Sequence, residues 1–182
     1  MFYYYYDWTY ILVLIGVVLS LLASAKVKST FARYSNVRSY SGMTGRDAAE
    51  KILHRNGIYD VQIIHISGNL TDHYNPTNKT LALSDPVYHS TSVAAIGVAA
   101  HECGHALQHA QAYSMLQLRS ALVPVVSFAS HWVQWVLLAG IVLSEMFPNL
   151  LLIGIILFAM TTLFSIVTLP VEIDASHRAL AW

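Results

Sequence analysis

Residues 150–169, LLLIGIILFAMTTLFSIVTL, decide the class of fold because they contain no charged side chain. A helix of about 20 apolar residues is long enough to cross the roughly 30 Å hydrocarbon core of a bilayer. Residues 121–143 form another such run, and membrane helices tolerate its Pro124, His131 and Gln134. The short linker 144–149 contains no Lys or Arg. We therefore expect a transmembrane hairpin that turns outside the cell.

Residues 8–25 form a further apolar run near the N-terminus. Ala23-Ser24-Ala25 resembles a cleavage site, so a removed signal peptide is one interpretation. A signal peptide carries positive charge before its apolar run, whereas here the charge before it is Asp7, among aromatic residues, and four basic residues follow within 26–38. The positive-inside rule then predicts an outside N-terminus and a cytoplasmic segment after residue 25.

The composition agrees with a chain that lies largely in lipid. Of the 182 residues, 55% are hydrophobic and 11% are charged, whereas a soluble domain carries about 25% charged residues. The net charge is zero and there is a single cysteine, so nothing indicates a nucleic-acid partner and no intrachain disulfide can form. We expect an anchor at 1–25, a cytoplasmic part at 26–120, a hairpin at 121–169 and a short helix at 170–182.

His101-Glu102-Cys103-Gly104-His105 is the stretch that indicates chemistry. Residues four apart lie on one face of a helix, so both imidazoles can reach one Zn²⁺. Glu102 lies beside the first imidazole, where it can take a proton from a water activated by the metal. This order of residues predicts Zn²⁺ as the cofactor and Glu102 as the catalytic base. We expect Cys103 to be a small buried residue rather than a ligand or a redox switch, and Gly104 to allow the close approach of a neighbouring element.

The predicted cytoplasmic part contains helical and strand patterns. Thr44 is a plausible N-cap for an amphipathic helix over residues 44–57. Residues 61–67 and 80–84 are strand candidates, which we expect to pack beside the helix that carries the two histidines. That helix is predicted to run from residue 93 to residue 119.

A catalytic zinc needs a third protein ligand. Glu172 follows the third apolar run, and Pro170 suits the start of a new helix on which Glu172 and Ser176 share a face. Ser176 could then hydrogen-bond a ligand histidine. Asp174 is the rival ligand, and a simple cap of charge at the membrane boundary is another interpretation. His109 continues the two-histidine face, but three histidines along one straight helix span about 12 Å and converge poorly.

Several motifs together resemble the YugP-like bacterial membrane zinc metallopeptidases, namely residues 70–76 (LTDHYNP), 81–88 (LALSDPVY), 94–109 and 169–180. The layout is also similar to that of the gluzincin membrane proteases, which place a transmembrane hairpin between the two-histidine motif and a ligand Glu. The resemblance implies His101, His105 and Glu172 as zinc ligands and Glu102 as the base. The supporting position that is usually Asp is Ser176 here. Family members continue with a further apolar segment, so we expect a shortened chain.

The predicted fold class is a mainly α membrane protein with three transmembrane helices and a small α+β, zincin-like catalytic domain. The predicted function is a zinc-dependent endopeptidase of the bacterial plasma (inner) membrane that hydrolyses peptides or membrane proteins on the cytoplasmic side. The oligomeric state is left open. The alternatives are a non-catalytic metal-binding scaffold, a metal transporter, or an accessory subunit of a quality-control assembly. The candidates for stabilising the oxyanion are Arg178, His177, His73 and Tyr74.

Overall fold

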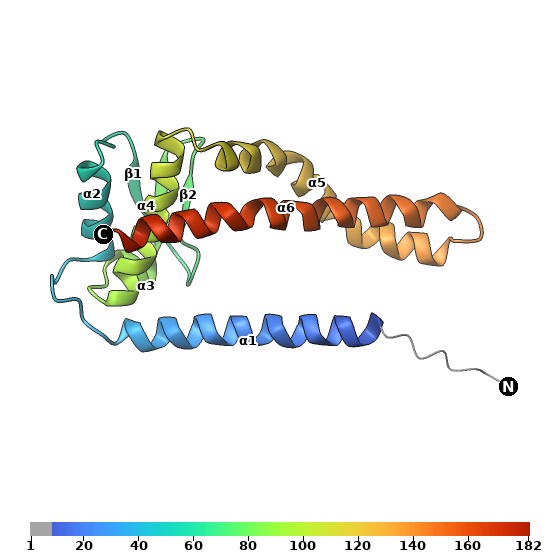
Figure 1. Cartoon of the computed structure of the whole chain (residues 1–182), viewed down its shortest axis with the longest axis horizontal. Coiled ribbons are helices and arrows are strands. Elements are labelled where there is room, and N and C mark those ends of the chain that lie inside the picture. The colour runs from blue at the N-terminus through green and yellow to red at the C-terminus, as the bar shows by residue number, and fades with distance from the viewer. Residues whose placement is uncertain (1–8) are drawn as a thin grey trace.

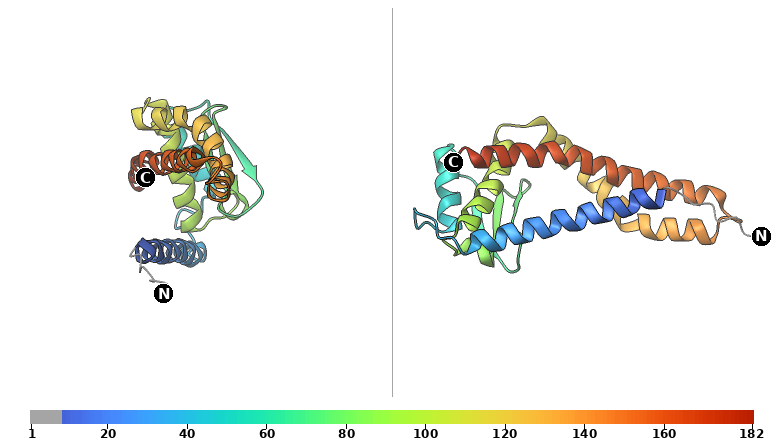
Figure 2. Two further views of the ribbon diagram at one scale, coloured as in Figure 1. Left: turned by 90° about the vertical axis from the view of Figure 1, so that its right-hand side faces the viewer. Right: turned by 60° about the horizontal axis from the view of Figure 1, so that its bottom comes forward.

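The computed structural model describes residues 9–182 (Figure 1), so Asp7 and the aromatic residues around it lie outside the described residues. Figures 1 and 2 show three long helices that project in one direction from a smaller body of helices and strands. The elements in chain order are α1 (Thr9–Ser35), α2 (Gly45–Arg55), β1 (Gln62–Ile66), β2 (His73–Asn75), β3 (Thr80–Ser84), α3 (Asp85–Tyr88), α4 (Val93–Ala110), α5 (Ser114–Val142) and α6 (Pro148–Leu180).

The three long helices α1, α5 and α6 are each long and apolar enough to cross a membrane, which confirms the three predicted candidate spans. Helices α5 and α6 form the predicted hairpin, and glycines bring their backbones together. A Cβ added at Gly140 would lie 2.7 Å from the Cα of Leu151, and one added at Gly154 would lie 2.7 Å from the Leu137 side chain. Small residues at such positions allow the close packing on which helix pairs in lipid depend.

Two predicted helix boundaries are wrong. Pro170 does not start a new helix, because α6 continues through it to Leu180. A proline inside a helix removes one backbone hydrogen bond, which membrane proteins tolerate when neighbouring groups compensate. The helix predicted over 93–119 ends instead at Ala110, since Ala112 adopts the left-handed region with φ of 51°. The amide of Tyr113 then bonds the carbonyl of Gln108, and the chain turns into α5.

Helix α2 begins at the predicted cap. The Thr44 hydroxyl accepts a hydrogen bond from the Asp47 amide at 3.1 Å, and the Asp47 carboxylate accepts one from the Thr44 amide at 3.2 Å. This reciprocal capping box satisfies two amides that the first turn of a helix leaves without partners.

The sheet has the strand order β1-β3-β2, and both predicted strands are present. Strand β3 lies in the middle, parallel to β1 and antiparallel to β2. Strand β2, with only three residues, was not predicted from the sequence. Residues 81–84 of the central strand are all buried.

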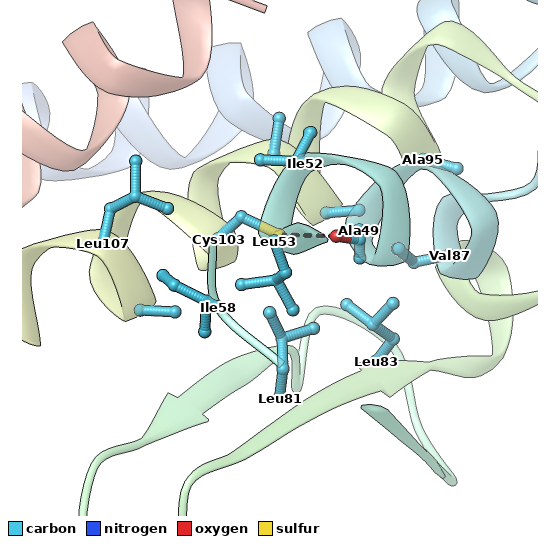
Figure 3. Packing of buried hydrophobic residues seen from close by; sticks show 13 residues of the cluster. Ala49, Ile52, Leu53, Ile58, Leu81, Leu83, Val87, Ala95, Cys103 and Leu107 are labelled. Atoms are coloured by element: carbon cyan, nitrogen blue, oxygen red, sulfur yellow. Dashed lines mark hydrogen bonds between the residues drawn. The ribbon is translucent and has the colours of Figure 1, made fainter. Parts of the chain in front are cut away.

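The hydrophobic core lies between α2, β3 and α4 (Figure 3). Helix α2 supplies Ile52 and Leu53, the sheet supplies Leu81 and Leu83, and α4 supplies mainly small side chains. Cys103 is fully buried in this cluster, and its thiol donates to the Ala49 carbonyl at 3.6 Å. The core thus holds one face of α4 against the sheet and leaves another face free to meet α6.

Candidate metal centre

Helix α4 carries the two histidines predicted as metal ligands. It begins at Ser92, whose hydroxyl accepts a hydrogen bond from the Ala95 amide at 3.2 Å. His101 and His105 follow on one face with ring centroids 4.9 Å apart, as the four-residue spacing predicts. His105 is buried and His101 is partly exposed.

Glu172 on α6 is the third side chain that the structure brings to this place. Its Oε2 atom lies 3.2 Å from Nε2 of His101 and 3.5 Å from Nε2 of His105. Tetrahedral zinc with bonds of about 2.0–2.1 Å places its ligand atoms roughly 3.3 Å apart. The three side chains therefore form a cluster that could hold a zinc ion, because their ligand atoms all lie within 4.8 Å of one another.

The two rival third ligands lie elsewhere in the structure. Asp174 accepts hydrogen bonds from Gln108 at 2.8 Å and from Arg178 at 2.6 Å. Nδ1 of His109 lies 2.8 Å from the Tyr74 hydroxyl. Neither joins the cluster formed by the other three side chains.

Close contact between α4 and α6 brings the two histidines and the carboxylate together. A Cβ added at Gly104 would lie 2.6 Å from the Ala175 carbonyl oxygen and 3.0 Å from its Cα. Real Cβ atoms essentially never approach so closely. The absence of a side chain at Gly104, directly before His105, lets α6 pass over α4 at this point, in agreement with the predicted close approach of a neighbouring element.

Hydrogen bonds on the far side of each imidazole direct Nε2 toward Glu172. Nδ1 of His105 lies 3.0 Å from Oε1 of Gln108, which can only accept, so this nitrogen carries the proton. The Gln108 amide is held in that orientation because its Nε2 donates to the Val171 carbonyl and to Asp174, each at 2.8 Å. Gln108 is fully buried. Metal-binding histidines commonly have such a partner.

His101 has a comparable partner. The Ser176 hydroxyl lies 3.2 Å from Nδ1 of His101, so it can accept the Nδ1 proton. This is the contact predicted from the shared face of Glu172 and Ser176 on one helix. Nδ1 of each imidazole therefore has a hydrogen-bond partner. Gln108 lies three residues after His105, and Ser176 lies four residues after Glu172.

A model of the family described as "Putative neutral zinc metallopeptidase" matches residues 9–182. The chain belongs to this family. It is also similar to a Bacillus subtilis (strain 168) protein named "Putative membrane protease YugP", with 49% identity over 161 residues that cover 88% of this chain and 71% of the relative. No solved structure gives a significant match to the chain.

Glu102, which directly follows the first histidine of this zinc-metallopeptidase sequence, is buried. Burial raises the pKa of its carboxyl group above the ordinary value, and the two nearby imidazoles oppose that shift. The negative charges of Asp72 and Glu172 add to the increase. The carboxyl group therefore lies in a mostly dry environment beside both histidines.

Arg119 was not singled out from the sequence, yet it lies beside the cluster. Its Nη2 atom is 4.0 Å from Oε1 of Glu172, the oxygen on the other side of the carboxylate from the imidazoles. Its buried Nε has no hydrogen-bond partner among the described residues. The turn at Ala112 brings α5 back past the site, and no sequence motif marks that turn.

The four residues considered from the sequence as oxyanion stabilisers have other neighbours. Arg178 pairs with Asp174 at 2.6 Å, and His177 is exposed. Nδ1 of His73 lies 2.8 Å from the Thr71 carbonyl, and burial raises the pKa of Tyr74 to about 12. Among the described residues, Arg119 is the cationic side chain that pairs with Glu172.

Proposed function

We propose that the protein is a membrane-embedded, zinc-dependent endopeptidase in which His101, His105 and Glu172 bind zinc and Glu102 is the catalytic base. The convergence of Glu172 on the two imidazoles carries this proposal, because its ligand-atom separations of 3.2 and 3.5 Å suit one tetrahedral ion. Family membership and a relative named as a membrane protease support the same reaction class.

Zinc in this site would polarise the scissile carbonyl and make a water molecule acidic enough to attack it near neutral pH. Glu102 lies next to His101 on α4, where it takes the proton of the attacking water and passes it to the leaving amine. The positively charged guanidinium of Arg119 lies beside Glu172, where it would stabilise the oxygen of the scissile carbonyl as that oxygen becomes negative.

We propose that the domain around α4 is zincin-like and of the gluzincin type, in which the third ligand comes from a later helix. The sheet packs beside α4, and β2 forms one edge of the sheet. An exposed strand edge can bind an extended peptide by adding it as a further strand. We therefore propose that β2 is the strand beside which the substrate chain lies.

The proposed topology places the N-terminus outside and the metal centre on the cytoplasmic side of a bacterial plasma membrane. The basic residues Lys26, Lys28 and Arg33 at the end of α1 support this orientation. The hairpin of α5 and α6 returns the chain to the end of the molecule where α4 lies, as Figure 1 shows. Labelling of single cysteines placed in residues 144–147 and 36–42 by an impermeant reagent on intact cells would report the orientation.

The decisive experiment compares Glu102→Gln with the wild-type protein, purified in lipid nanodiscs and loaded with zinc. We expect Glu102→Gln to retain one zinc per chain by metal analysis while its cleavage of a labelled unfolded protein falls by about 10²–10⁴-fold. Glu50→Gln is the matched control, because Glu50 lies on α2 and pairs with Arg46 at the surface.

Equal cleavage by Glu102→Gln and the wild type would refute the proposed base. Zinc binding by a wild-type protein that cleaves no peptide or protein would instead favour a metal-binding scaffold or an accessory subunit. Loss of cleavage on chelation and its return with zinc complete the test of metal dependence.

A further inference from the structure

An apolar groove of about 440 Å³ lies between the end of α1 and the start of α4. Helix α1 contributes Val27, Phe31 and Tyr34, and α4 contributes Gly97 and Val98. The volume is within the range of about 300–1,000 Å³ that is typical of ligand sites. Figure 1 shows α1 passing the N-terminal end of α4 at this point.

The groove lies on the same face of α4 as the metal centre. Gly97 precedes His101 by four residues, and His101 precedes His105 by four, so the three positions form one stripe along the helix. One such step rises about 6 Å along the helix axis. An extended peptide advances about 3.3 Å per residue, so a substrate with its scissile bond at the metal would place a side chain two residues away level with Gly97.

No contact within the described residues requires a glycine at position 97. A Cβ added there would meet nothing within 4 Å, in contrast to Gly104, where α6 passes too closely for a side chain. Glycine inside a helix lowers its stability relative to alanine. Glycine at position 97 therefore lowers the stability of α4, and packing among the described residues does not explain its presence.

We propose that this groove is a specificity subsite that takes a bulky apolar side chain, such as Leu or Phe, two residues from the scissile bond of the peptide substrate. The proposal rests on the proposed peptidase function. The walls supplied by Val27, Phe31 and Val98 would bury such a side chain. Lys26, which also lines the groove, disfavours a basic residue there.

The groove is also where a substrate chain leaving the bilayer beside α1 would first meet α4. Residues 9–25 of α1 are exposed along their whole length, and their side chains are mainly apolar. The substrate class that fits is a polypeptide segment adjoining a membrane helix, with an apolar residue close to the cleavage point.

The test uses quenched fluorescent peptides, identical except for Leu, Ser or Lys at each position near the cleaved bond. For the wild type we expect kcat/KM to be about 10- to 100-fold higher with Leu than with Ser at one position two residues from the bond. Gly97→Leu fills the groove and should lower kcat/KM for the Leu peptide to about the value for the Ser peptide. Gly16→Leu is the control, because Gly16 is equally open but lies far along α1.

A second variant tests the wall formed by α1, because Gly97 also borders another cavity, which lies beside α2. Val27 lines the proposed subsite but not the cavity beside α2, and its side chain is largely exposed. Val27→Asp should lower kcat/KM for the Leu peptide and raise it for the Lys peptide. If both Gly97→Leu and Val27→Asp rank the Leu, Ser and Lys peptides by kcat/KM as the wild type does, the proposed subsite is overturned.

Binding separates failure of the subsite from failure of the peptidase function. Fluorescence anisotropy with zinc-loaded Glu102→Gln should show about 10- to 100-fold tighter binding of the Leu peptide than of the Ser peptide, and the added Gly97→Leu change should remove the difference. That result supports the groove even if the wild type cleaves nothing. Equal binding of the Leu and Ser peptides overturns the proposed subsite. It is also overturned if Gly97→Leu releases a bound phospholipid and leaves the peptide preference unchanged.

Discussion

Replacing Gln108 with leucine tests whether the hydrogen bond behind His105 prepares the metal site. The substitution keeps an uncharged buried side chain but removes the acceptor 3.0 Å from Nδ1 of His105. The Val171 carbonyl retains its place in the helix, and Asp174 retains Arg178 at 2.6 Å. Nδ1 of His105 is then left without its hydrogen-bond partner, and an unpaired buried polar group costs about 1–3 kcal/mol.

We expect the free energy of unfolding of metal-free Gln108→Leu to fall by about 1–3 kcal/mol and its zinc affinity to fall by about 10–100-fold. Competition with a chromophoric chelator measures the affinity, and denaturation followed by circular dichroism measures the stability. Gln111→Leu is the matched control, because Gln111 is an exposed glutamine that accepts a hydrogen bond from Arg178. Wild-type zinc affinity in Gln108→Leu would refute the inference that Gln108 selects the tautomer of His105.

Three further predictions concern the elements that position the site. Gly104→Ala forces its Cβ against Ala175, so we expect a loss of about 1–3 kcal/mol in stability and weaker zinc binding, checked by the same two assays. Ala112→Gly relieves a left-handed alanine and should raise the thermal midpoint, with a stabilisation of about 1 kcal/mol; a lower midpoint would contradict this. Thr44→Ala should cost about 1 kcal/mol at pH 7. The hydrogen bonds from Thr44 lower the pKa of Asp47, so the carboxylate's share of the cap is present above the unfolded pKa of about 3.9 and lost as the pH falls through the lower folded pKa. The stability difference between wild type and variant should therefore shrink near about pH 3 without vanishing, because the Thr44 hydroxyl still accepts from the Asp47 amide.

Local patterns in the sequence were sufficient to predict much of the fold. Charge-free runs predicted the candidate spans because crossing a bilayer demands length and apolarity from the segment itself. The Thr44 cap was also predictable, since both partners lie within one turn. The end of α4 was not predictable, because Ala112 adopts a conformation that favours glycine, and only the surrounding structure holds it there.

The candidate metal site was likewise predictable only in part. A spacing of four residues predicted the histidine pair. The predicted hairpin, together with the resemblance to membrane zinc peptidases, favoured Glu172 over Asp174 as the third side chain. Gln108 is three residues from His105, so the helical neighbour rule could have identified it. Arg119 could not be found in this way, because its position depends on the turn between α4 and α5.

The separation of Glu172 from His101 by 71 positions has a consequence for biosynthesis. The ribosome makes both histidines well before the carboxylate, and the entire hairpin must emerge between them. For the proposed zinc endopeptidase, a nascent chain that has not yet inserted its last two apolar helices lacks the third ligand, so hydrolytic activity would arise only after the hairpin has assembled in the bilayer.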